Sequence, residues 1–164
     1  MKKIITSLFV LSVCMVNAQA FKGKGDIKAQ VGANIQSGGT GVMVSADFGI
    51  GENMSVGLVG NYMLSANDIF GVQPKFEDRV DLKARFNANL GNVLKLDPKM
   101  DVYPGLDLGT RNFGAHVGFR YFFTEGFGVF AETGIPIASY KNNLSGFNYY
   151  NNQFGVNIGA SFNL

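Results

Sequence analysis

The sequence predicts an all-β protein, an eight-stranded antiparallel up-and-down transmembrane β-barrel with a filled lumen. Apolar and polar residues alternate in blocks of about ten residues, which is the pattern of strands in a membrane barrel. Only 16% of the 164 residues are charged, against roughly 25% in an ordinary soluble domain. The 22 glycines and 15 phenylalanines favour a closed β structure over a helical one.

The first four strands are predicted from stripes in which every second residue is apolar. The first stripe runs from Ile27 to Ile35 and the second from Val42 to Ile50. The third runs from Met54 to Leu64 and the fourth from Val80 to Leu90. Because successive side chains of a strand point to opposite faces, each segment has one apolar and one polar face.

The last four strands follow the same pattern. The fifth runs from Met100 to Leu108 and is interrupted by Pro104, the sixth from Phe113 to Phe123, and the seventh from Phe127 to Ile137. The eighth, Phe154 to Leu164, alternates without a break. An even number of strands is typical of bacterial single-chain barrels.

The connections between the stripes differ in length in a regular way. Gly51-Glu52-Asn53 and Thr124-Glu125-Gly126 are tight turns, whereas Ser65 to Arg79 and Lys141 to Asn152 are longer and polar. Bacterial barrels have short periplasmic turns and longer extracellular loops. The two long loops are therefore expected outside the cell, with both termini in the periplasm. Gly91 to Lys99 is long for the periplasmic turn that this order requires.

An export signal is predicted for residues 1–20, which leaves residues 21–164 as the barrel domain. Two lysines precede an apolar run from Ile4 to Val13, and the small residues Ala18 and Ala20 offer two cleavage sites. The run is shorter than the roughly 20 residues that a membrane-spanning helix needs. We therefore expect the mature chain to be exported and folded in the outer membrane of a Gram-negative bacterium.

The mature chain is expected to be neutral and free of cysteine. The whole chain has 14 basic and 12 acidic residues, and two lysines leave with the signal. Neutrality gives no indication of a nucleic-acid partner. Cys14 lies within the signal, and His116 is the single histidine, so neither a metal site nor another cofactor is predicted.

We expect the apolar stripe to face lipid and the polar stripe to face the lumen. About five large apolar side chains per strand would not fit inside a barrel of eight strands. The polar stripe is rich in glycine, which is costly in a strand unless another group approaches closely. Aromatic residues gather near both ends of the strands, as in the girdles of membrane barrels: Phe48, Phe123, Phe127 and Phe162 at one end, and Tyr62, Phe113 and Phe154 at the other.

The lumen is predicted to hold an ion-pair network. Charges of both signs lie on the polar stripe, and unpaired charges in a narrow lumen would be costly. We expect Asp81, Lys83 and Arg85 to pair with Asp101 and Asp107 on the next strand. A closed plug is favoured over a selective pore or a proton path, because barrels of this size have packed interiors. The network comprises Asp47, Asp81, Lys83, Arg85, Asp101, Asp107, His116, Arg120 and Glu132, with Lys28 on the same stripe.

No catalytic site is predicted. A catalytic histidine needs a nucleophile and an orienting carboxylate within reach, and no serine lies within two positions of His116. Two alternatives stay open at this point: a soluble secreted or periplasmic lipid-binding barrel, which would turn the apolar stripe inward, and a membrane-embedded lipid-modifying enzyme. Phe147, Tyr149 and Tyr150 in the second long loop are candidate contacts for a partner, because exposed tyrosine makes adaptable contact surfaces.

Three stretches carry a family resemblance: Ala20-Phe21-Lys22-Gly23-Lys24-Gly25-Asp26, Lys83-Ala84-Arg85-Phe86-Asn87-Ala88-Asn89-Leu90-Gly91 and Arg120-Tyr121-Phe122-Phe123-Thr124-Glu125-Gly126-Phe127-Gly128. They resemble a family of small exported proteins of Bacteroidetes-type bacteria, which looks like a branch of the OmpA/OmpX-type barrel superfamily. The resemblance implies an outer-membrane, porin-like barrel and no known activity. One departure is Leu164, since many such barrels end in an aromatic residue.

Together these observations predict a structural or partner-binding role. The expected partners are outer-membrane lipid and another outer-membrane protein, contacted through the extracellular loops or within a larger outer-membrane assembly. No nucleic acid, metal or cofactor is expected.

Overall fold

The structure, a computed structural model, describes residues 18–141 and 146–164. Most of the predicted export signal, including Cys14, lies outside the described residues, as do residues 142–145 of the second long loop. Within the described part, no helix has both the length and the apolar composition needed to cross a membrane.

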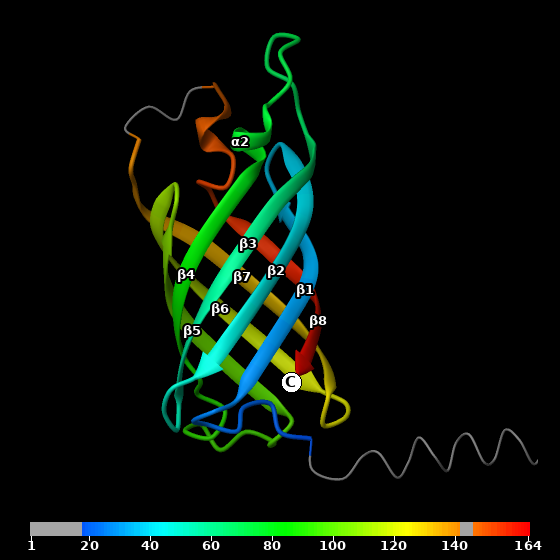
Figure 1. Cartoon of the computed structure of the whole chain (residues 1–164), viewed down its shortest axis with the longest axis vertical. Coiled ribbons are helices and arrows are strands. Elements are labelled where there is room, and N and C mark those ends of the chain that lie inside the picture. Colours follow the sequence, from blue (N-terminus) through cyan, green and yellow to red (C-terminus); the bar gives the residue numbers. More distant parts are fainter. Residues whose placement is uncertain (1–17, 142–145) are drawn as a thin grey trace, which may run out of the picture.

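Eight antiparallel strands close into one barrel, which confirms the predicted fold class (Figure 1). Each strand pairs with its neighbours in chain order, and β8 returns to pair with β1. A short helix, α2 (Phe76–Arg79), precedes β4, and a 3₁₀ turn, η1 (Gly146–Tyr149), precedes β8. The strands are β1 (Ile27–Gln36), β2 (Gly39–Gly49), β3 (Met54–Ala66), β4 (Val80–Ala88), β5 (Met100–Gly109), β6 (Asn112–Phe122), β7 (Phe127–Ser139) and β8 (Gly155–Asn163).

Closure leaves no free strand edge. Val31 on β1 lies opposite Val44 on β2 and, on its other side, opposite Ala160 on β8. The backbone hydrogen bonds of the sheet are therefore satisfied within the barrel, which is the condition for a strand to lie in hydrocarbon.

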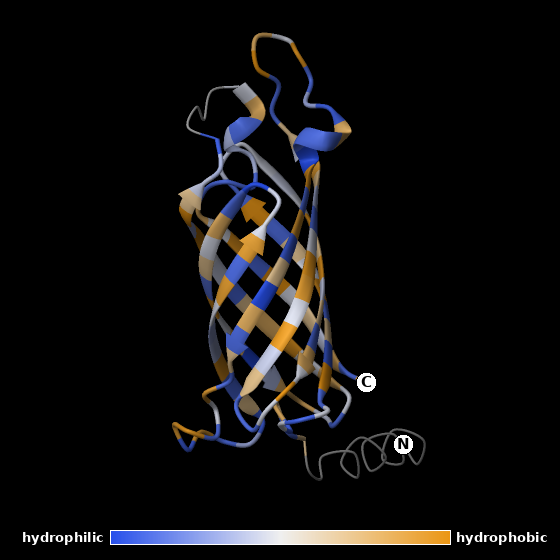
Figure 2. Cartoon of the chain, turned by 60° about the vertical axis from the view of Figure 1, so that its left-hand side comes forward, coloured by the Kyte–Doolittle hydropathy of each residue, from blue (hydrophilic) through white to orange (hydrophobic). Residues whose placement is uncertain are grey.

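The two faces of the sheet have the predicted polarity. Leu58 and Leu108 on the outer face are 65% and 62% exposed, whereas Asp81 and Arg120 on the inner face are fully buried. Figure 2 shows hydrophobic and hydrophilic residues alternating along the strands. An apolar exterior around a polar interior is the arrangement of a barrel dissolved in lipid, and the reverse of a soluble lipid carrier.

The barrel has two different ends (Figure 1). The end that carries the long connections before β4 and before β8 is called the loop end here. The opposite end, where the chain enters β1 and leaves β8, is called the terminus end. There the backbone N–H of Ala20 donates to the carbonyl oxygen of Pro98 at 2.7 Å. The predicted long turn at residues 91–99 thus contacts the segment that leads into β1.

Aromatic side chains form a connected group on the outer surface at the terminus end. The ring centroids of Phe123 and Phe127 lie 6.1 Å apart, and those of Phe127 and Phe162 lie 5.7 Å apart. Tyr121 contacts Phe123 edge-on at 5.1 Å. Such a group is suited to the boundary between hydrocarbon and water.

Candidate functional site: the charged lumen

The inner face of the barrel carries every charged residue that was predicted to line the lumen. All of them except Lys83, which is half-buried, are buried. They come from six strands: Lys28 on β1, Asp47 on β2, Asp81, Lys83 and Arg85 on β4, Asp101 and Asp107 on β5, His116 and Arg120 on β6, and Glu132 on β7.

Arg85 is the centre of the largest polar cluster. Its Nε and Nη2 donate to the two carboxylate oxygens of Asp47, at 2.6 and 2.5 Å, and its Nη1 donates to Glu132 at 2.9 Å. Nη2 also lies 3.0 Å from both Gln30 Oε1 and Ser45 Oγ. The guanidinium of a β4 residue therefore bonds to side chains of β1, β2 and β7 across the lumen. We call this arrangement the Arg85 cluster.

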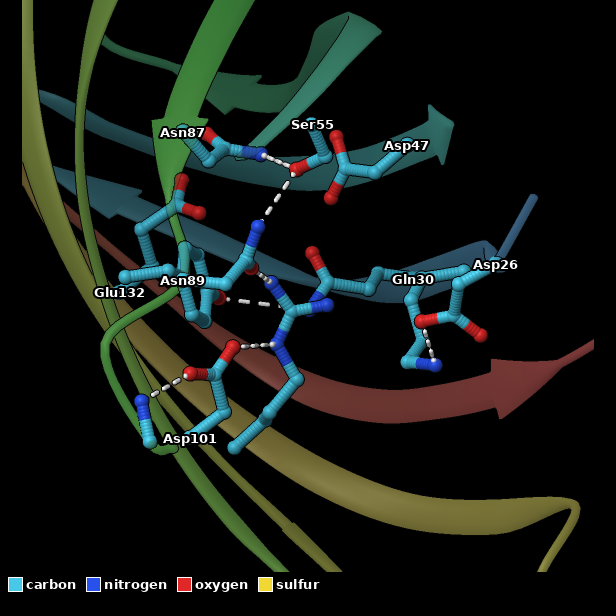
Figure 3. Close-up of polar contacts among 12 residues, drawn as sticks. Asp26, Gln30, Asp47, Ser55, Asn87, Asn89, Asp101 and Glu132 are labelled. Atoms are coloured by element: carbon cyan, nitrogen blue, oxygen red, sulfur yellow. Dashed lines mark hydrogen bonds and ion pairs between the residues drawn. The ribbon is translucent and has the colours of Figure 1, made fainter. Parts of the chain in front are cut away.

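His116 occupies a second cluster, nearer the loop end. Its Nδ1 lies 3.1 Å from Oδ2 of Asp107, and its Nε2 lies 2.8 Å from Oδ1 of Asn87. Asn87 in turn donates from Nδ2 to Ser55 Oγ at 3.1 Å (Figure 3). This bond fixes the amide so that its oxygen, and not its nitrogen, faces the imidazole. An amide oxygen, and not a hydroxyl nucleophile, therefore faces the ring nitrogen that a catalytic triad would use.

Asp81 is held from both sides at the loop end of β4. Thr110 donates from Oγ1 to Asp81 Oδ1 at 2.8 Å, and the Lys83 ammonium lies 3.6 Å from Oδ2.

A third cluster lies toward the terminus end. Arg120 Nε lies 3.5 Å from Oδ2 of Asp101, whose Oδ1 accepts the backbone N–H of Gly91 at 2.9 Å (Figure 3). The Arg120 guanidinium stacks on the ring of Tyr103, 3.9 Å from its centroid. Asn89 accepts a hydrogen bond from Arg120 Nη2 at 3.3 Å. A buried arginine is thus surrounded by a carboxylate, an amide and an aromatic face.

Lys28 closes the lumen beneath this cluster. Its ammonium forms an ion pair with Asp26, and it lies 5.4 Å from the centroid of the Phe122 ring. Both Lys28 and Phe122 are buried.

The predicted pairing of the β4 charges with Asp101 and Asp107 is wrong. Arg85 lies directly opposite Asp107 in the sheet, yet its side chain reaches across the lumen to Asp47 and Glu132. The β5 carboxylates are paired on their other side, with residues of β6, because Asp101 lies opposite Arg120 in the register. A long arginine is not limited to its neighbouring strand, and sequence spacing does not show which partner it reaches.

Two glycines make room for rings in the lumen. A Cβ on Gly118 would lie 2.1 Å from the Tyr103 ring, and one on Gly105 would lie 2.5 Å from the His116 ring. Tyr103 lies opposite Gly118, and His116 opposite Gly105. Each ring therefore covers the glycine of the adjacent strand, and at these two positions the close approach explains the glycine.

The uncharged members of the lumen network were missed at the sequence level. Gln30 and Ser45 bond to Arg85, Asn87 bonds to His116, and Asn89 bonds to Arg120. Tyr103 is fully buried and accepts a hydrogen bond from Gln30 at 3.3 Å. All five occupy the same alternate positions as the charges, so extending the polar stripe to amides and hydroxyls would have found them.

A small polar cavity remains between these clusters and the loop end. Its volume of about 40 Å³ has room for a few water molecules. Asn34, Asn61, Lys83, Asp107 and Glu132 are among the residues that line it. Among the described residues, no group of three or more His, Cys, Asp or Glu side chains is arranged to hold a metal ion.

The predicted loop contacts turn inward over the mouth of the barrel. Phe147 stacks on Tyr150 with centroids 5.9 Å apart, and Tyr149 lies 4.3 Å from Tyr150. The Tyr150 hydroxyl donates to the carbonyl oxygen of Asn67 at 2.7 Å, and burial raises the pKa of Tyr150 to about 12. The expectation that these three residues are exposed is wrong: Tyr150 is fully buried, and Phe147 and Tyr149 are half-buried.

Comparison with models of protein families assigns the sequence to one family. The model of a family of unknown function (DUF6646) matches residues 10–164. The chain belongs to this family. The match spans the whole barrel of the DUF6646 protein, together with part of the predicted export signal. No curated protein matches the sequence.

Solved structures show what this DUF6646 chain resembles in fold. A de novo designed transmembrane β-barrel is 12% identical, with a TM-score of 0.56, over 87% of this chain and 98% of that one. The designed barrel TMB2.3, solved by NMR in solution, is 15% identical, with a TM-score of 0.50, over 87% and 96%. The outer membrane protein G of Pseudomonas aeruginosa is 11% identical, with a TM-score of 0.48, over 88% and 99%. The designed barrels place the chain in the transmembrane β-barrel fold, and a fold by itself does not assign a function.

Proposed function

We propose that this protein is an outer-membrane barrel of Gram-negative, Bacteroidetes-type bacteria whose lumen is closed to ions. It acts without catalysis, as a structural or partner-binding protein, either through its extracellular loops or as an accessory subunit of a larger outer-membrane assembly. The loop end faces the cell exterior and the terminus end faces the periplasm. Within this proposal the protein is a member of the OmpA/OmpX-type barrels.

The Arg85 cluster is the observation that carries the proposal. One guanidinium joins side chains from opposite walls of the barrel, with Asp47 on β2 and Glu132 on β7. A buried arginine held by two carboxylates cannot leave its place without uncovering charges in a narrow lumen. The Arg120 and Lys28 contacts add two more polar obstructions toward the terminus end.

Neither alternative role is supported by an observation of its own. A lipid carrier would need an apolar interior, whereas buried ions occupy this lumen. A lipid-modifying enzyme would need a nucleophile beside His116, whose two ring nitrogens face Asp107 and Asn87.

Ion conductance tests the closed lumen. Purified, refolded protein is inserted into planar lipid bilayers in concentrated potassium chloride, with an open porin in parallel to show that insertion yields steps of current. We expect no reproducible conductance step from the DUF6646 barrel. A stable open channel of uniform size would contradict the closed lumen, and with it the proposal.

A further inference from the structure

An apolar tip projects from the loop end, in the connection between β3 and α2. Ile69 and Val72 pair with each other through two backbone hydrogen bonds, each of 3.0 Å, and Phe70 and Gly71 form the turn between them. Figure 1 shows this connection reaching beyond the other loops, and Figure 2 shows its far end as hydrophobic. We call residues 69–72 the apolar tip.

Two side chains of the apolar tip, Phe70 and Val72, are exposed to solvent, whereas Ile69 is half-buried. Phe70 is 102% exposed and Val72 is 61% exposed. A large aromatic side chain that stays exposed at the end of a loop buries no apolar surface and so does not stabilise the fold. Exposed apolar groups of this kind mark sites of interaction with another molecule.

The backbone of the apolar tip is strained by the residue it carries. Phe70 and Gly71 both have left-handed φ angles, 54° and 80°, as a two-residue type I′ hairpin turn requires. Asparagine and glycine adopt this conformation readily, but a bulky aromatic residue does so at a cost. A costly residue held at an exposed turn indicates that its side chain has a use outside the fold.

The base of the connection is fixed to the barrel. Asn67 donates its backbone N–H to Gly38 at 2.9 Å and accepts from the Tyr150 hydroxyl at 2.7 Å. Arg79 donates from Nε to the carbonyl oxygen of Pro74 at 3.2 Å. The apolar tip is therefore presented on an anchored support, which lowers the entropy lost on binding.

The charge of the segment distinguishes between kinds of partner. The connection from Ser65 to Arg79 carries three acidic residues, Asp68, Glu77 and Asp78, and two basic residues, Lys75 and Arg79, so that its net charge is 2 − 3 = −1. Segments that insert at an anionic membrane surface carry clusters of lysine and arginine beside their apolar residues. A connection of net negative charge is not attracted to such a surface, which favours a protein as the partner. A second copy in the same membrane would point its tip in the same direction, which does not bring the tip of one copy onto the other.

We infer that the apolar tip is a docking element that inserts Phe70 into an apolar pocket of a different protein at the cell surface. This inference rests on the proposed partner-binding role of the loop end. It places the contact on Phe70 and Val72, in place of the predicted Phe147, Tyr149 and Tyr150. A single exposed aromatic residue that fills a pocket is the common form of a binding hot spot.

The test uses the full-length protein in the cells that make it. A photoreactive phenylalanine analogue replaces Phe70 in one strain and Val93, an exposed apolar residue of the 91–99 turn, in a control strain. A second pair of variants, Phe70→Asn and Val93→Asn, is compared with the wild type by co-purification. Phe70→Asn suits a type I′ turn better than the native residue, so the barrel is expected to fold.

Two results together support the inference. Position 70 forms a covalent adduct with one discrete protein that position 93 does not form, and the same protein co-purifies about 30-fold less with Phe70→Asn, the loss expected for a hot-spot aromatic. The Val93→Asn variant co-purifies with that protein as well as the wild type does. An adduct with lipid only, an adduct of two copies of this chain, no adduct at all, or unchanged co-purification with Phe70→Asn would each overturn the docking role. Those results would not contradict the closed lumen. A conducting channel in planar bilayers would contradict the closed lumen, whichever adducts form at position 70.

Discussion

At the scale of single residues, the lumen depends on charges that have no access to bulk water. Arg85 is the clearest case, since five polar contacts to Asp47, Glu132, Gln30 and Ser45 hold its fully buried guanidinium. Such a group contributes little when compared with a well-packed apolar core, but removing one partner leaves the others uncompensated. The cost of a substitution therefore comes mainly from the carboxylates that remain.

Replacing Arg85 with Met is expected to destabilise the barrel by about 3–5 kcal/mol, because Asp47 and Glu132 then stay buried without a cation. Arg111→Met is the matched control. Arg111 bonds to the carbonyl oxygens of Glu77 and Val80 outside the lumen, and its loss should cost about 1 kcal/mol. Urea unfolding in detergent micelles, followed by gel mobility, measures both. Equal midpoints for the two variants would show that Asp47 and Glu132 are not left buried without compensation when Arg85 is removed.

Gly118→Ala tests the close packing of rings against glycines. A Cβ at this position would lie 2.1 Å from the Tyr103 ring, which is itself fully buried. We expect a loss of about 1–3 kcal/mol, as for overpacking in a filled interior. Gly126→Ala is the control, because nothing lies within 4 Å of a Cβ there. An unfolding midpoint of Gly118→Ala equal to that of the wild type would show that the Tyr103 ring does not pack closely against Gly118.

At the scale of elements, the strands were predictable and the side-chain pairing was not. Alternation is a local property of the chain, and segments such as 127–137 and 154–164 carry it with almost no interruption. The reach of Arg85 to β7 depends on the curvature of the closed sheet, which no local pattern encodes. The apolar tip was missed for a similar reason, because four residues in a polar loop carry no periodic signal.

The segment that leads into β1 makes a prediction about maturation. Gln19 accepts a hydrogen bond from Asn163 Nδ2 at 3.4 Å, and the fully buried Ala20 shares an apolar cluster with Phe122. Cleavage after Ala20 would remove these contacts, whereas cleavage after Ala18 keeps them and removes only Ala18 from the cluster. We therefore expect the mature chain to begin at Gln19, which intact mass measurement of the membrane-extracted protein determines. A chain that begins at Phe21 would contradict the structural role given to Gln19 and Ala20.

At the scale of the whole molecule, the apolar exterior and the closed ladder of hydrogen bonds have one consequence. Large apolar side chains such as Leu58 and Leu108 cover the outer face. In water this surface would be exposed to solvent, so the barrel is stable only in lipid or detergent. All eight strands are paired on both sides, so detergent finds no free edge at which to begin unfolding. A protein built in this way stays in the membrane and keeps its fold in detergent until it is heated.

The most direct test of the account is gel mobility in sodium dodecyl sulfate, with and without boiling, on membranes washed with alkaline carbonate. The account predicts that the protein remains in the washed membranes and that the unboiled form migrates differently from the boiled form. Release by carbonate, together with a single band in both lanes, would contradict it, because it would mean that the apolar face does not lie in lipid.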